Sequence, residues 1–77
     1  MTKIETAEWI SGYKLSDLWS DPMYINLIKG CAKAYKDCSE LAQHLNHSFN
    51  KLTLKQQEMF ADIVTNTWER VNFGLGI

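Results

Sequence analysis

Between Tyr24 and Leu52, apolar or small residues recur at alternating steps of three and four positions. The series is Tyr24, Leu27, Cys31, Ala34, Cys38, Leu41, Leu45 and Leu52, and only Ser48 breaks it. A second line at seven-residue spacing flanks the first and consists of Ile28, Tyr35, Ala42 and Phe49. Such spacing is typical of an α-helix with a wide apolar face. The pattern predicts one long helix over residues 22–48, of the kind that forms the centre of a bundle.

This predicted helix is long for so small a chain. A helix over 22–48 would span about 40 Å, which exceeds the width of the core that the chain can build. Gly30, Ala34 and Cys38 form a row of small residues at four-residue spacing, which lets another helix backbone approach closely. We therefore expect a second molecule on part of this helix, and a homodimer through it is a secondary prediction.

Two further helices are predicted by their start and stop signals. Residues 2–11 place apolar side chains on one face, and Gly12 suits the left-handed position that ends a helix. A short helical turn is expected at 16–20. The segment Thr53–Gln56 has the form of a capping box, in which two side chains bond the first free backbone N–H groups, so it starts a helix over 54–72.

Length and composition agree with a folded helical domain. The chain has 77 residues, of which 45% are hydrophobic and 22% charged, and this balance is ordinary for a globular protein. A chain of this length allows one domain with a marginal core. The predicted fold is therefore all-α: a small bundle of three to four helices around one long central helix, in a single domain over 1–77.

Charge and cysteine content bear on which partners the protein has and in which compartment it acts. The formal net charge is −1, whereas dedicated nucleic-acid binders usually carry a basic surplus. No apolar run approaches the roughly 18 residues that span a membrane, and no secretory leader is evident. On one helix Cys31 and Cys38 would stand about 10 Å apart, too far for a disulfide. Two reduced, buried cysteines are expected, and with them a cytoplasmic location.

No arrangement of residues predicts catalysis, a cofactor or a metal. Glu40, His44 and His47 lie at spacings that could offer three ligands on one helix face. No second cluster of ligands accompanies them, and closed zinc sites need four. Solvated histidines near a helix end are the simpler interpretation, so the protein is predicted not to be an enzyme.

One motif offers an alternative function. Residues 39–48 resemble the first helix and turn of a helix-turn-helix, which would place the following segment in the DNA major groove. In a DNA-binding regulator using 39–56, Lys51 and Lys55 would contact the phosphates. Two positive charges are few for that task, and Thr53 caps a new helix where a recognition helix should already be in progress. DNA binding is therefore the less favoured prediction, but it stays open.

The aromatic residues of the N-terminal arm point to a protein partner. Trp9, Tyr13 and Trp19 stand among acidic residues, and tryptophan and tyrosine anchor protein–protein contacts. Core packing is the alternative explanation for all three. The predicted function is a small protein-binding module that acts stoichiometrically, as an inhibitor, adaptor or antitoxin-like regulator. Such proteins are frequent in phages and mobile elements, and the expected origin rests on that analogy. The predicted partner-binding residues are Trp9, Tyr13, Trp19, Gly30, Ala34 and Cys38.

Overall fold

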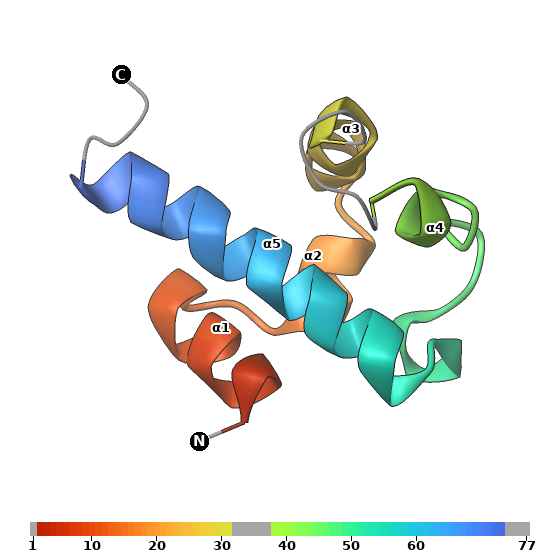
Figure 1. Ribbon diagram of the computed structural model, residues 1–77, viewed down its shortest axis with the longest axis horizontal. Coiled ribbons are helices and arrows are strands. Elements are labelled where there is room, and N and C mark those ends of the chain that lie inside the picture. The colour runs from red at the N-terminus through yellow and green to blue at the C-terminus, as the bar shows by residue number, and fades with distance from the viewer. Residues whose placement is uncertain (1, 32–37, 74–77) are drawn as a thin grey trace.

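The computed structural model describes residues 2–31 and 38–73, with side chains described as far as residue 69. Within these ranges the regular structure is helical throughout, which confirms the all-α class. The elements are α1 (Lys3–Ser11), α2 (Leu15–Trp19), α3 (Pro22–Cys31), α4 (Cys38–Ala42), the 3₁₀ turn η1 (Phe49–Lys51) and α5 (Leu54–Phe73). In Figure 1, α5 runs through the middle of the molecule, with α1 on one side and α3 and α4 on the other.

The ends of α1 and the start of α2 follow from neighbouring residues. Thr2 caps α1 through its Oγ1, which accepts a backbone N–H of the first turn at 3.1 Å. Gly12 ends α1 with a φ of 76°, and its N–H donates to the carbonyl of Glu8. The Glu8 carboxylate in turn accepts the N–H of Leu15 at 2.9 Å. One side chain therefore joins the end of α1 to the first residue of α2.

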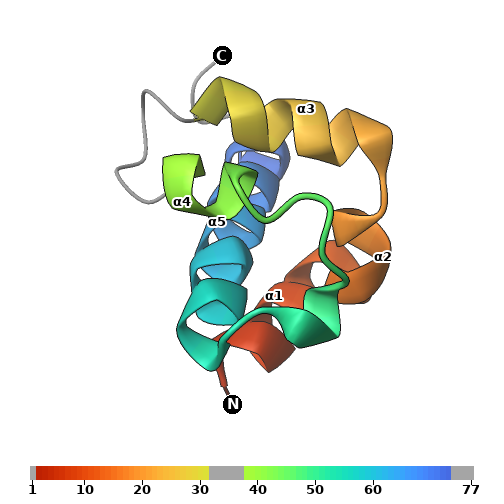
Figure 2. The same cartoon turned by 90° about the vertical axis from the view of Figure 1, so that its right-hand side faces the viewer.

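The predicted single helix over 22–48 is wrong. On a straight helix Cys31 and Cys38 would be about 10 Å apart, and every other pair across the gap further still. The Cα atoms of α3 and α4 nevertheless approach within 8 Å of one another, and Figure 2 shows two separate helices. A helix of about 40 Å would also exceed the longest extent of the molecule, which is 32 Å. After Ala42 the chain continues in turns rather than in a helix.

The start of α5 confirms the predicted capping box. The backbone N–H of Gln56 donates to Thr53 Oγ1 at 3.2 Å, and the side chain of Gln56 accepts the N–H of Thr53 at 3.0 Å. Gln57 adds two bonds to the preceding segment, because its Nε2 donates to the carbonyls of Phe49 and Leu52. These bonds hold η1 against the first turn of the helix.

The core is built around α5, not around the segment predicted as central. Phe60 of α5 is fully buried, and three other aromatic rings surround it: Trp19 at 5.1 Å, Tyr24 at 5.8 Å and Phe49 at 5.9 Å between centroids. These spacings fall in the range that favours tilted and edge-to-face ring pairs. The ring cluster joins α2, α3 and η1 to α5, while α1 packs on α5 and contributes the fully buried Ala7 to the core.

Candidate functional site

The structure divides the predicted partner-binding residues into three groups. Trp9 and Tyr13 are exposed, at 75% and 59%, and Gly30 also lies at the surface. Trp19 and Cys38 are core residues, at 3% and 0% exposure, so their prediction as contact residues is wrong. Ala34 lies outside the described residues. The candidate surface is therefore carried by Trp9 and Tyr13, which we call the aromatic surface.

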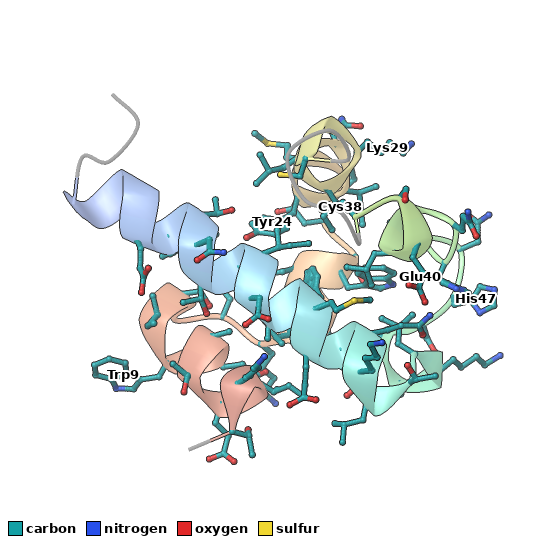
Figure 3. The ribbon with its side chains drawn as sticks, viewed as in Figure 1. Trp9, Tyr24, Lys29, Cys38, Glu40 and His47 are labelled. Atoms are coloured by element: carbon teal, nitrogen blue, oxygen red, sulfur yellow. The ribbon has the colours of Figure 1, made fainter. Side chains whose placement is uncertain are left out.

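Trp9 is exposed because of its register on α1. Ala7 and Ser11, four positions apart, are the buried residues of this helix. Glu5 and Trp9 are also four apart and occupy the opposite side, so their side chains share one exposed face. Figure 3 shows Trp9 projecting away from the body of the molecule. A tryptophan on the outer face of a helix adds nothing to the packing of that helix against α5.

Tyr13 follows the turn at Gly12 and is held in place from two directions. Its backbone N–H and carbonyl both bond to the hydroxyl of Ser11, at 3.2 Å each. Its ring meets the ring of Trp68 edge to face, with centroids 6.4 Å apart. Trp68 is half-buried and also contacts Tyr24, at 5.6 Å between centroids. Tyr13 is thus anchored to the core through the ring of Trp68 on α5.

The contact of Tyr13 with Trp68 could not be predicted from the sequence. The two residues are far apart along the chain, and only the packing of α1 against α5 brings them together. No local spacing in the sequence indicates this pair.

Trp19 has a structural role instead of a binding role. Its indole Nε1 donates to the backbone carbonyl of His47 at 2.7 Å, and its ring packs against Phe49 and Phe60. A buried indole N–H normally finds such a partner. The bond fixes the turn that follows α4, so Trp19 positions the segment leading into η1.

A second exposed apolar face lies on α3. Met23 and Leu27 are exposed at 81% and 39%, and their four-residue spacing places them on one side of the helix. Gly30 is exposed too, and a Cβ atom added to it would meet no atom within 4 Å. The predicted row of small residues does not continue into α4, because Cys38 starts a separate helix and is buried in the core.

The region of the helix-turn-helix alternative has a different geometry from that motif. A helix-turn-helix joins its two helices by a turn of about three or four residues. Here the whole of 43–53, including η1, separates α4 from α5. Lys51 and Lys55 are exposed and could reach a phosphate. DNA binding by another geometry therefore stays a prediction.

The two histidines lie next to each other after α4. The rings of His44 and His47 meet edge to face with centroids 5.3 Å apart. Within 2–31 and 38–73, no cluster of three or more histidine, cysteine or acidic side chains could hold a metal ion. The spacing of Glu40, His44 and His47 in the sequence therefore does not correspond to a three-residue metal site among the described residues.

Tyr24 carries a buried hydroxyl group without a hydrogen bond. Burial raises the pKa of this phenol from 10.0 to about 12. The hydroxyl of Thr67 lies close enough to act against this rise, although it does not reach hydrogen-bonding geometry, and Cys31 adds to the rise. A buried phenolate would lose its hydration without gaining an opposite charge, so Tyr24 stays neutral. Its ring packs in the core.

Comparisons with protein-family models, with curated proteins and with solved structures found no match to this chain. Among the described helices, none combines the length and apolar character needed to cross a membrane.

Proposed function

We propose that the chain is a small protein-binding module that acts stoichiometrically on a partner protein through the aromatic surface of Trp9 and Tyr13. An inhibitor, an adaptor and an antitoxin-like regulator are the roles that such a module would serve. The observation that carries the proposal is the 75% exposure of Trp9 on a helix whose packing does not require it.

The area of Trp9 is large enough to matter for binding. A tryptophan side chain buries about 150–250 Å² when it is enclosed, so three quarters of it amounts to about 150 Å². At about 25 cal/mol per Å² that area represents about 4 kcal/mol before the costs of association. Side chains that contribute about 2 kcal/mol or more are the ones that dominate interfaces. Trp9 therefore has the size of an interface anchor.

The cysteines support a reducing compartment as the place of action. Cys31 and Cys38 are not joined in a disulfide, and both belong to or pack against the hydrophobic core. A chain that depends on no disulfide is suited to the cytoplasm, which is where we propose that it acts.

A homodimer is a separate proposal and rests on α3 alone. Met23, Leu27 and Gly30 give this helix an exposed, mostly apolar side. The row of small residues does not extend along one helix, because Cys38 starts α4 and is buried, so the dimer would use the exposed side of α3. Light scattering at micromolar concentration tests it directly, and a mass of 8.9 kDa would exclude the dimer.

The test of the main proposal is photo-crosslinking from defined positions. A photoreactive phenylalanine analogue replaces Trp9 in one variant, Tyr13 in a second and Leu54 in a third. Leu54 is the matched control because it is an exposed apolar residue on a different helix, at the start of α5. We expect one dominant adduct, with one copy of the chain, from the first two positions and not from the third.

Two results would contradict the proposal. The first is the absence of an adduct from both aromatic positions under conditions that capture a known control complex. The second is equal crosslinking from Leu54, which would indicate non-specific adhesion. The free energy of unfolding of the Trp9→Ala protein should stay within about 0.5 kcal/mol of the wild-type value, as is usual for surface positions. Loss of the partner would then not reflect loss of the fold.

A further inference from the structure

We propose that Glu5 and Trp9 together form a receptor for a cationic side chain, an arginine of the partner protein. This inference rests on the proposed function and names the chemistry that the aromatic surface recognises. The partner segment would be basic, with one arginine lying over the indole ring.

The two residues share the outer face of α1. Glu5 is exposed and precedes Trp9 by one helical turn, a spacing that brings Cβ atoms to about 5–6 Å from each other. The hydroxyl of Thr2 donates to Glu5 Oε1 at 3.2 Å and accepts the N–H of the same residue at 3.1 Å. The carboxylate is therefore held near the start of the helix instead of moving freely. The carboxylate-bearing Glu5 and the indole-bearing Trp9 are thus both exposed on the same side of α1.

The charges of α1 leave this face negative. The lysine of this helix, Lys3, directs its Nζ to Asp62 Oδ2 at 3.3 Å, toward α5 and away from the outer face. The carboxylate of Glu8 is occupied by the N–H of Leu15. Glu5 is the exposed acidic residue of α1, while Lys14 follows only after the helix has ended. A positively charged partner group complements this surface, and a negative one does not.

Arginine fits the pair better than lysine does. Tryptophan is the strongest cation–π partner among the aromatic side chains, and guanidinium groups use it more often than ammonium groups. The planar guanidinium can stack flat on the indole while its N–H groups reach a neighbouring carboxylate in bidentate fashion. A partner that offered only an apolar side chain would use Trp9 and leave Glu5 unpaired.

The experiment titrates the full chain with a nona-arginine peptide at low salt and follows the indole N–H signal of Trp9 by NMR. A nona-lysine peptide of the same charge is the comparison. We expect the Trp9 signal to shift with nona-arginine and binding to be at least threefold weaker with nona-lysine. Glu5→Gln should weaken nona-arginine binding by about threefold to tenfold, and Trp9→Ala should weaken it at least as much.

The matched control is Asp17→Asn, which removes an exposed carboxylate from α2 and leaves α1 intact. If this control weakens binding as much as Glu5→Gln does, the attraction is general electrostatics and the inference is wrong. Binding that survives Trp9→Ala unchanged would overturn it as well. The proposed function fails separately, through the crosslinking test. A partner captured through Trp9 and bound equally by the Glu5→Gln protein would keep that function and remove the arginine receptor.

Discussion

Removing the hydroxyl of Tyr24 should leave the fold as stable at pH 7 or make it more stable. The Tyr24→Phe variant keeps the ring that packs against Phe60 and Trp68, at 5.8 and 5.6 Å between centroids. It deletes a buried hydroxyl that has no hydrogen-bond partner. Leaving such a group unsatisfied costs about 1–3 kcal/mol. We expect Tyr24→Phe to raise the free energy of unfolding by up to about 1 kcal/mol. The gain is smaller than the full cost of the unsatisfied hydroxyl, because the substitution also removes the attraction between that hydroxyl and the polar groups around it.

The same phenol should make the stability of the wild-type protein depend on alkaline pH. Its pKa is 10.0 in the unfolded chain and about 12 in the fold, so the fold favours the neutral form. The stability that comes from keeping this phenol neutral is fully present below pH 10 and is lost as the pH rises toward 12. Two pKa units correspond to about 2.7 kcal/mol in total, of which about 1.4 kcal/mol is lost by pH 11.

Urea unfolding of the wild type and Tyr24→Phe at pH 8, 10 and 11 measures this difference, since other alkaline titrations cancel between the two proteins. Tyr13→Phe is the matched control, because this tyrosine is mostly exposed. The gap between Tyr24→Phe and the wild type should widen by about 1.4 kcal/mol between pH 8 and 11. A gap for Tyr24→Phe that does not widen would refute the burial argument. A loss of more than about 1 kcal/mol at pH 7 would show that the hydroxyl is bonded after all.

Three further substitutions test the elements around the core. Thr53→Ala removes the cap of α5 and should lower the free energy of unfolding by about 1 kcal/mol in urea, whereas no change would mean that another group replaces the cap. Trp19→Phe removes the donor that the His47 carbonyl accepts and leaves a space in the core, so we expect a loss of about 2 kcal/mol by the same assay. Gly30→Ala adds a methyl group that meets no atom within 4 Å and should stabilise the monomer by about 0.5–1 kcal/mol. A destabilised Gly30→Ala protein, or one whose mass falls by light scattering, would place a second molecule against α3.

Features that depend on neighbouring residues were predicted correctly from the sequence. The left-handed Gly12 and the pair Thr53 and Gln56 both act across four positions or fewer. Asp21 likewise accepts the N–H of Met23 at the start of α3, as its position before Pro22 indicates. Such bonds form wherever the local backbone is helical, so they require no knowledge of the tertiary fold.

The prediction of one long helix was wrong because the apolar periodicity does not distinguish one helix from two helices that follow each other along the chain. Tyr24 and Ile28 of α3 face the same core as Cys38 and Leu41 of α4. When both helices bury one side in a common core, their apolar positions continue in step even though the helices are separate. The helix at the centre of the fold is α5, whose side chains include Phe60, Ala61 and Val64, all fully buried. Periodicity shows which residues are buried and not against which element.

The exposure of the tryptophans illustrates the same limit and also separates stability from binding. Trp19 is fixed in the core by its bond to His47, and Trp68 forms a half-buried bridge between Tyr13 and the core. Trp9 occupies the outer face of α1, where Ala7 already provides the close contact with the rest of the fold. Nothing in the local sequence distinguishes these three environments. Because the fold does not need the indole of Trp9, its substitution removes a surface for a partner at little cost in stability, which makes this residue the sharpest test of what the protein does.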